Sequence, residues 1–591
     1  MKNKTRMLSA FIGILVSAAI IFIILKDINL PIYFYLFILF VGGLLGFVAP
    51  REELNDISSE EAGDNQYGSA RWATKEEELE QFSLVDDKSA TQPGIVIGRK
   101  DKKYEVDTSD QNISLIAPPG SGKTKRLIIP TIRYNALVNI KTDGKGASMV
   151  LTDLKGELRD TTKVMLEKSG YVTPALDFAN PLLSPKFNLL YNVNKYMDNY
   201  QKDETEEEKL ISYGKAERYA KILAESIISN MNTTSASEAS EYFNETSRGL
   251  ITGIALLVSE YGEENQRHII SVFKLIIELN GLQEGSSDTL QKSKLEELLQ
   301  YVDNERIVNY VGPSMKADVR TSMNIFSSAL GKLVKFIDAE LEQMICSHDE
   351  SLNDMDFIKN PTAIFVICPD ENPTRHFFAS LFIRYLMNDL IEQSRLTNGI
   401  LTRNVICLWD EFGNMPPIQD IDVLFSAARS RGIRFLIALQ SYAQLEKHYS
   451  KQMAEIILDS TQITIFTYVS PNARATAERF SKMLDNQTIK TGSVSYGSNN
   501  SSISYQLMQK PLLDPGDIMT MEAGNFVVVK AGKHPVKTVL PLWWYYISKK
   551  TFKPYKAKNK AEIVIISYLT EQQLMNMSKK KSCGLKKGMF D

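Results

Sequence analysis

The sequence predicts an α/β fold that is interrupted by an all-helical domain and preceded by an apolar hairpin. Two observations predict the sheet. The apolar run 114–117 leads into a glycine-bearing loop and then a helical segment, and the apolar run 405–409 ends in two adjacent carboxylates. A third observation predicts the insertion, because the chain between these runs, from about 192 to 345, shows apolar residues mainly at helical spacing.

The composition is that of a folded protein with more than one domain. A chain of 591 residues is too long for one compact domain, and 43% hydrophobic with 24% charged residues excludes wholesale disorder. A net charge of −3 confines any nucleic-acid contact to a local surface. The four cysteines form no CxxC pair and the five histidines show no HExxH spacing. We therefore expect reduced core thiols, and a metalloprotease site has no support.

Two apolar runs open the chain, at residues 8–25 and 30–48, separated by a short break that contains Lys26 and Asp27. Each is long enough for a membrane-spanning helix, so residues 1–50 are expected to form a transmembrane hairpin. A cleaved signal peptide is the alternative, but a second run that follows at once favours a retained hairpin. Basic residues precede the first run and Arg51 follows the second. The positive-inside rule then predicts a multi-pass protein of the cell membrane, with the bulk of the chain in the cytoplasm.

The loop after the first strand has the composition of a phosphate-binding loop. Such a loop needs glycines to turn backbone N–H groups toward an anion, a lysine for the terminal phosphates and a hydroxyl for Mg²⁺. The sequence therefore predicts that ATP and Mg²⁺ bind at Ala117, Pro118, Pro119, Gly120, Ser121, Gly122, Lys123 and Thr124. Ala117 stands where the usual pattern has its first glycine. Pro130 predicts that the helix after the loop ends within about two turns.

The second strand supplies the acidic groups that hydrolysis requires. Asp410 is expected to hold the metal together with Thr124, and Glu411 to polarise the attacking water. Asp153 also follows an apolar run but lacks a paired carboxylate, so we assign it to a neighbouring strand of the same sheet. The alternative for Asp410 and Glu411 is an acidic cap of a following helix.

Three further polar residues are candidates for the same chemistry. Gln440 lies at the end of the predicted strand 434–439, where an amide can sense the terminal phosphate. Arg429 or Arg431 could act as an arginine finger in the site of a neighbouring subunit. The alternative is that both arginines are solvated charges at the end of a helix.

These features divide the chain into five parts. They are the hairpin 1–50, a first nucleotide-binding part 51–191, the all-α domain 192–345, a second nucleotide-binding part 346–550 and a basic tail 551–591. The serine- and glycine-rich stretch 491–504 is expected to be a mobile loop. The tail could bind nucleic acid or anionic lipid, or could be a disordered solubilising segment.

An ordered set of motifs resembles the TraG/TraD-type coupling proteins of type IV secretion and conjugation, in the style of a Gram-positive element. The set comprises YGSARWAT at 67–74, the loop 117–124, DLKGE at 153–157, NPL at 180–182, LWDEF at 408–412, RSRG at 429–432, Gln440 and KPLL at 510–513. The resemblance covers nearly the whole chain from the apolar runs to about residue 545. Ala117 and Lys510 depart from the usual glycine and arginine.

The resemblance implies a RecA-like ATPase motor and a membrane-anchored hexamer. Its expected task is to receive a relaxase-bound single DNA strand from the relaxosome and to pass it to the type IV secretion channel proteins. Two alternatives remain. One is a double-stranded DNA translocase like those of cell division and sporulation, and the other is an assembly scaffold that binds ATP without hydrolysing it.

Overall fold

The computed structural model describes residues 31–48, 65–229, 238–280, 294–346, 357–368, 375–496, 501–555 and 563–588, with Leu15, Ala18, Glu60, Glu61 and Leu352. The described residues form two compact units. One comprises those of 1–70 and 485–512, and the other those of 71–484 and 513–591.

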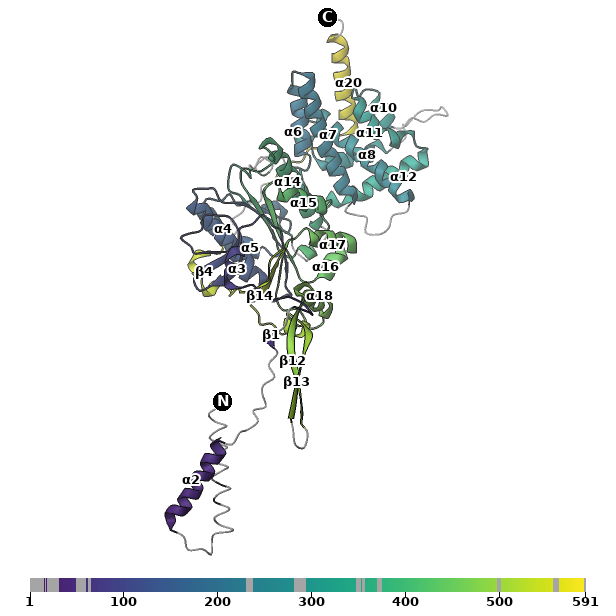
Figure 1. The fold of residues 1–591 in the computed structure, drawn as a ribbon. Helices are drawn as coiled ribbons and strands as arrows, with labels where there is room; N and C mark the ends of the chain where they lie inside the picture. The colour runs from purple at the N-terminus through teal and green to yellow at the C-terminus, as the bar shows by residue number, and fades with distance from the viewer. Residues whose placement is uncertain are drawn as a thin grey trace. The chain divides into compact units, whose positions relative to one another are not determined.

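A nine-stranded sheet organises the larger unit (Figure 1). Seven neighbouring strands, from β11 to β7 in spatial order, are parallel, and β14 and β15 continue the sheet antiparallel at the β11 edge. The spatial order is β15 (Val536–Val539), β14 (Asn525–Lys530), β11 (Ile463–Phe466), β5 (Ile113–Ile116), β10 (Ile433–Leu439), β9 (Val405–Trp409), β6 (Ser148–Asp153), β8 (Ala363–Ile367) and β7 (Ala175–Asp177).

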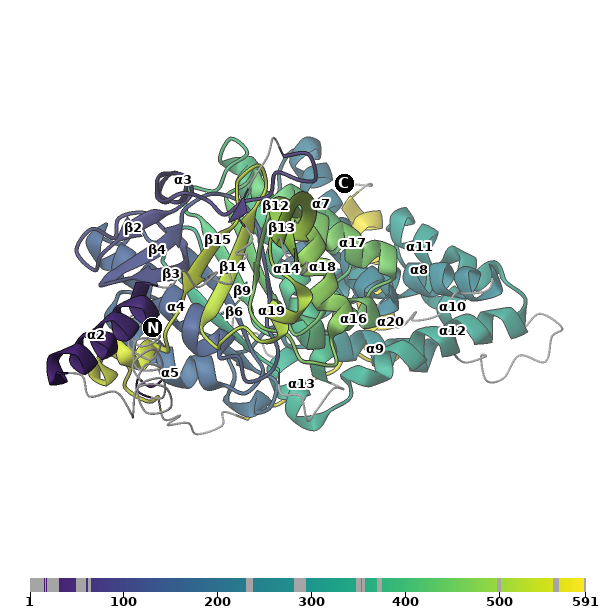
Figure 2. The same ribbon diagram turned by 60° about the horizontal axis from the view of Figure 1, so that its bottom comes forward.

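Helices cover both faces of this sheet, as Figures 1 and 2 show. Every residue of β5, β6, β8, β9 and β10 is buried, which explains why these strands are continuous apolar runs rather than alternating ones. One face carries α4 (Ile129–Lys141) and α5 (Glu157–Lys168). The other carries α14 (His376–Leu396), α15 (Ile421–Arg429), α16 (Tyr442–His448), α17 (Lys451–Asp459) and α18 (Arg474–Leu484). The sequence prediction of an α/β sheet is confirmed.

The helix after the loop is longer than predicted. A π-helical turn, η1 (Thr124–Ile128), leads directly into α4, and Pro130 lies in the first turn of α4. Proline lacks an N–H and crowds the carbonyl four residues earlier, so it normally ends or kinks a helix. Here the wider turn before Pro130, closed by a bond from the Ile129 N–H to the Thr124 carbonyl, accommodates the ring. The prediction of a short helix was therefore wrong.

Between β7 and β8 the described chain is helical and contains no strand. Its longest helices, α7 (Glu206–Ser229) and α8 (Glu238–Tyr261), pack against each other, and α8 also packs against α11 and α12. Leu250, Ile254 and Leu257 give α8 its fully buried face. The other helices are α6 (Tyr191–Lys202), α9 (Ile269–Leu279), α10 (Lys294–Leu299), α11 (Glu305–Lys316), α12 (Val319–Leu333) and α13 (Ala339–Ile345).

The C-terminal segment is ordered where it is described. Residues 563–570 lead into α20 (Glu571–Gly588), drawn in yellow in Figure 1, which packs against α8, α9 and α10. Leu569 and Leu574 are fully buried, and Lys294 pairs with Glu571 at 3.0 Å. The alternative of a disordered tail was therefore wrong for residues 563–588. The lysine content suggested a solvated chain, whereas two leucines anchor the segment to the helical part.

The smaller unit contains a long β-hairpin. Strands β12 (Asn486–Tyr496) and β13 (Ser501–Pro511) pair antiparallel along their whole length, and β1 (Glu60–Glu61) pairs with β12. The mobile loop predicted at 491–504 is therefore wrong for 491–496 and 501–504. Serine and glycine favour loops by composition, but a continuous antiparallel ladder overrides that weak preference.

The predicted membrane hairpin lies partly outside the described residues. The run 8–25 lies outside the described residues except for Leu15 and Ala18, and the second run forms α2 (Ile32–Val48). No helix within the described residues is both long and apolar enough to cross a membrane.

A buried pair of carboxyl groups lies beside the small antiparallel sheet of β2 (Ser83–Val85), β4 (Lys103–Asp107) and β3 (Ile95–Lys100). Burial and a hydrogen bond with Glu78, from α3 (Lys75–Gln81), raise the pKa of Glu105 from 4.5 to about 8. Two ionised carboxylates have no donor between them. A proton on Glu105 provides one, while Lys100 forms an ion pair with Glu78.

We expect this pair to make stability depend on pH. Between pH 4.5 and 8 the folded protein keeps a proton on Glu105 that the unfolded chain releases, so stability falls as pH rises, by up to about 1.4 kcal/mol per pH unit. Glu105→Gln keeps a donor and removes the titration. Thermal melting from pH 5 to pH 8 should fall less steeply for this variant than for the wild type, and equal slopes would contradict the assignment.

Candidate nucleotide-binding site

Three neighbouring parallel strands end at the same edge of the central sheet. The loop 117–124 follows β5, Gln440 follows β10, and Asp410 with Glu411 follows β9. Because adjacent strands are about 4.8 Å apart, the ends of β5 and β9 lie about 10 Å apart with β10 between them. A lysine side chain and a triphosphate both fit this span. Asp153 ends β6, next to β9, as the sequence predicted.

The loop has the backbone shape that an anion requires. Gly120 and Gly122 have φ of +80° and +79°, a region that other residues rarely adopt. The Ala117 N–H donates to the Leu439 carbonyl at 2.9 Å, which extends the ladder between β5 and β10. Ala117 has no positive φ, so this position tolerates a side chain. The helix that begins at Thr124 adds further N–H groups at its N-terminus.

The lysine of the loop contacts both acids of the distant strand. Lys123 Nζ lies 3.8 Å from Asp410 Oδ1 and 3.5 Å from Glu411 Oε1. Thr124 Oγ1 donates a hydrogen bond of 2.5 Å to Asp410 Oδ2. The structure thus places four of the predicted site residues in direct contact, although the two motifs are remote in sequence.

The site offers oxygens that suit a hydrated Mg²⁺ ion. Asp410 is almost completely buried, and burial raises its pKa, so a nearby cation would favour the ionised form. Asp410 Oδ1 and Ser121 Oγ are buried and have no hydrogen-bond partner among the described residues. A hydroxyl and a carboxylate are typical protein ligands of Mg²⁺. The residues present therefore fit a magnesium nucleotide.

Glu411 has an unusual backbone and an amide partner. Its φ is +53°, in the left-handed region that few non-glycine residues occupy. Glu411 Oε2 accepts a hydrogen bond from Asn414 Nδ2 at 3.1 Å, and Asn414 Oδ1 accepts one from Gln444 Nε2 at 3.0 Å. Sequence reasoning missed Asn414 and Gln444. Only the closeness of Asn414 to the acidic pair could have indicated the first of them.

Arg429 and Arg431 lie at the opposite edge of the sheet. They precede β10, and the Gly432 carbonyl accepts from the N–H of Val405, the first residue of β9. The seven-residue strand β10 spans about 20 Å, so neither arginine can reach the loop 117–124 of its own chain, which lies at the other end of the strands. A role of either arginine at a phosphate loop would therefore require the loop of a neighbouring subunit.

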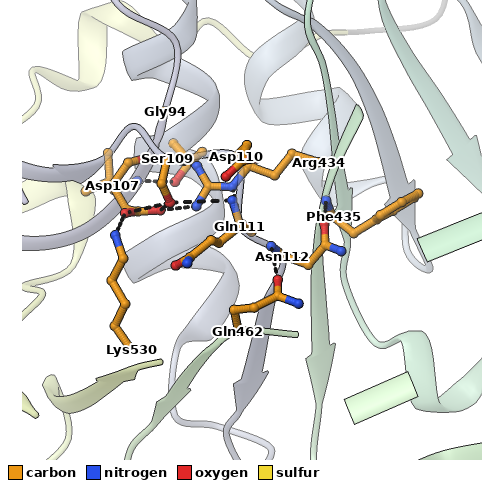
Figure 3. A network of polar contacts seen from close by, with 12 residues as sticks. Gly94, Asp107, Ser109, Asp110, Gln111, Asn112, Arg434, Phe435, Gln462 and Lys530 are labelled. Atoms are coloured by element: carbon orange, nitrogen blue, oxygen red, sulfur yellow. Dashed lines mark hydrogen bonds and ion pairs between the residues drawn. The ribbon is translucent and has the colours of Figure 1, made fainter. Parts of the chain in front are cut away.

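A buried polar network fixes this opposite edge (Figure 3). Asp107 is fully buried and pairs with Arg434, at the start of β10, and with Lys530 at 2.9 Å. Arg434 also donates to the carbonyl of Gln111 at 2.6 Å. Next to it, Asp110 pairs with the half-exposed Arg429 at 3.0 Å. Arg431 instead donates to the Ala427 carbonyl in the last turn of α15, the helix that precedes it.

Together, the parallel sheet, the glycine-bearing loop and the facing acids define an α/β protein of the P-loop class. The family described as Type IV secretory system Conjugative DNA transfer matches residues 61–580. The chain therefore belongs to this family of type IV secretion coupling proteins.

Solved structures of coupling proteins have a similar fold. The unbound monoclinic form of the bacterial conjugative coupling protein TrwBdeltaN70 is 12% identical, covers 85% of this chain and 99% of its own, and has a TM-score of 0.54. The plasmid coupling protein TrwB in complex with the ATP analogue ADPNP is 13% identical, covers 77% and 88%, and has a TM-score of 0.51. At this identity the likeness is one of fold. A comparison with curated protein sequences gives no match.

Proposed function

We propose that this protein is a membrane-anchored, Mg²⁺-dependent ATPase that drives a relaxase-bound single DNA strand into a type IV secretion channel. The observation that carries the proposal is the contact of Lys123 with Asp410 and Glu411, at 3.8 and 3.5 Å. A site that only binds nucleotide has no need of a second, water-activating carboxylate. Family membership supplies the conjugative setting, and the related TrwB is known in complex with ADPNP.

Each group of the site has a role in this proposal. The N–H groups of 120–124 and Lys123 bind the phosphates, and Thr124 and Asp410 hold Mg²⁺. When bound, Mg²⁺ neutralises charge on the phosphate oxygens. Glu411 accepts a proton from the attacking water, and Gln440, at the end of the strand between the two motifs, senses the terminal phosphate.

Assembly and location are part of the same proposal. The runs 8–25 and 30–48 would anchor the chain in the cell membrane, with the ATPase on the cytoplasmic side. A homo-hexamer would bring Arg429 or Arg431 of one subunit to the nucleotide of the next. In a ring, a few basic side chains per subunit are multiplied around a central channel, which reconciles DNA transport with a net charge of −3.

ATP hydrolysis by the full chain, with and without DNA, tests the proposal. We expect that single-stranded DNA stimulates hydrolysis more strongly than duplex DNA does. We also expect that Lys123→Ala abolishes both ATP hydrolysis and conjugative DNA transfer. Lys125→Ala is the matched control, because Lys125 is two residues away and pairs with Glu157 at the surface. A preference for duplex would favour a double-stranded DNA translocase, and an absence of hydrolysis would favour a scaffold.

A further inference from the structure

A chain of three hydrogen bonds connects the end of β10 to Glu411. The Gln440 N–H donates to Gln444 Oε1 at 3.0 Å, Gln444 Nε2 donates to Asn414 Oδ1 at 3.0 Å, and Asn414 Nδ2 donates to Glu411 Oε2 at 3.1 Å. We call Gln444 and Asn414 the amide relay. Gln444 lies in α16 and Asn414 in the turn η6 (Phe412–Asn414), so the relay joins two segments that follow different strands.

The backbone fixes the polarity of every bond in the relay. The N–H of Gln440 can only donate, so the oxygen of Gln444 must face it and the NH₂ group of Gln444 must face Asn414. The oxygen of Asn414 then faces Gln444, and its NH₂ group faces the carboxylate. Each amide therefore has one orientation that satisfies its partners, and Glu411 receives a donor from a fixed direction.

The packing around the turn leaves little freedom for the relay to change. A Cβ atom on Gly413 would lie 2.8 Å from Gln444 Oε1 and 3.0 Å from Gln444 Cβ, so the glycine allows Gln444 to approach. Glu411 itself has a φ of +53°, which the next residues hold through a bond from the Asn414 N–H to the Glu411 carbonyl at 2.8 Å. Strained backbone of this kind is found where the surrounding structure imposes it.

The amide relay is most important for the orientation of the Glu411 carboxylate when nucleotide is bound. Lys123 contacts Glu411 Oε1 at 3.5 Å in this structure. In the proposed function Lys123 turns to the phosphates, and the hydrogen bond from Asn414 remains to orient the carboxylate. The end of β10 lies next to the loop, because Ala117 donates to Leu439, so the relay also connects Glu411 to the strand that borders the phosphates.

We propose that Asn414 and Gln444 are positioning residues that aim the Glu411 carboxylate at the attacking water. This inference rests on the proposed function, since it assigns roles within the same site. A purely structural role for Asn414 would be to close the turn after β9. Loss of such a role would change thermal stability and nucleotide binding. It would not make the effect of an Asn414 substitution on kcat depend on whether Gln444 is present.

Steady-state ATP hydrolysis by the full chain tests the inference. Asn414→Ala is expected to lower kcat by about ten- to hundredfold, because a misplaced catalytic group costs rate, while KM and the affinity for a non-hydrolysable ATP analogue stay within about twofold. Gln444→Met should lower kcat less, and the double variant no more than Asn414→Ala alone, because Gln444 acts through Asn414. Gln452→Met, an exposed glutamine on the next helix, is the control.

Three results would overturn the inference: an unchanged kcat in Asn414→Ala, losses that multiply in the double variant, or an equal loss in Gln452→Met. If Asn414→Ala does not fold, Gln444→Glu also tests whether the orientation of the Asn414 amide controls kcat. The second oxygen of this glutamate would face Asn414 and reverse the Asn414 amide, so that Glu411 loses its donor and kcat should fall. Full activity of Gln444→Glu would overturn the inference. If the wild type does not hydrolyse ATP, or Glu411→Gln is fully active, the proposed function fails and the inference with it. If Glu411→Gln is inactive but Asn414→Ala is fully active, the inference alone fails.

Discussion

Replacing Glu411 by glutamine is expected to lower kcat for ATP hydrolysis by about 1000-fold, within the range seen when a positioned general base is lost. Glutamine has nearly the same shape and can still accept from Asn414, but it cannot take a proton from water. Lys123 and Thr124, which hold the phosphates and the metal in our proposal, are unchanged. ATP should therefore bind with nearly unchanged affinity, and the variant should accumulate bound nucleotide.

Rapid quench of single turnovers, together with nucleotide-binding titrations, separates these two effects. Asp410→Asn provides a matched comparison, because it alters the neighbouring acid that Thr124 contacts. We expect that variant to lose Mg²⁺-dependent affinity as well as rate. A Glu411→Gln variant that hydrolyses ATP at more than about a tenth of the wild-type rate would exclude Glu411 as the base.

Arg429→Ala is expected to lower kcat by about 1000-fold if Arg429 is the residue that reaches a neighbouring subunit, because arginine fingers contribute 10³–10⁵. The structure favours Arg429 over Arg431 for this role. Arg429 is 41% exposed, and its pair with Asp110 is a surface ion pair that costs little to release. Arg431 lies beyond the end of α15 and donates to the Ala427 carbonyl in its last turn. Arg431→Ala should therefore have a much smaller effect.

Mixing two inactive variants tests whether Arg429 acts between subunits. Lys123→Ala supplies an intact Arg429, and Arg429→Ala supplies an intact phosphate loop. In randomly mixed rings with head-to-tail interfaces, about a quarter of the sites would combine both intact groups, so part of the activity should return. If the mixture is as inactive as its components, Arg429 does not act in the site of a neighbour.

The sequence was most informative where residues carry chemistry. The loop 117–124 and the pair Asp410–Glu411 could be recognised because phosphate binding and water activation restrict residue type and spacing. Fully buried strands such as β9 and β10 could be recognised because a parallel sheet covered on both faces needs continuous apolar runs. The loop and the acidic pair were expected to lie close together because both follow strands that were assigned to one sheet.

Features that depend on tertiary contacts could not be predicted. Pro130 was expected to end a helix, because the local rule does not foresee a π-helical turn that makes room for it. Gln444 joins the site only through the packing of α16 against the turn after β9, and no motif contains it. Residues 563–588 appeared as a basic tail because the two leucines that anchor them are few beside the lysines.

The place of the two arginines follows from the order of the motifs. They precede the run 435–439 whereas Gln440 follows it, so in a parallel sheet they lie at the edge opposite the loop. The register shows the same, because the N–H of Val405, at the start of β9, donates to the Gly432 carbonyl whereas Asp410 follows the end of β9. A role in the chemistry then depends on a neighbouring copy, which a single chain does not contain.

The central claim is that the loop after β5 and the acids after β9 form one site for magnesium and ATP. A structure of the full chain with Mg²⁺ and a non-hydrolysable ATP analogue tests it most directly. We predict the triphosphate on the N–H groups of 120–124, Lys123 on the terminal phosphates, and the metal between Thr124 and Asp410. A nucleotide bound elsewhere, or one that contacts the loop while its metal lies away from Thr124 and Asp410, would contradict the claim.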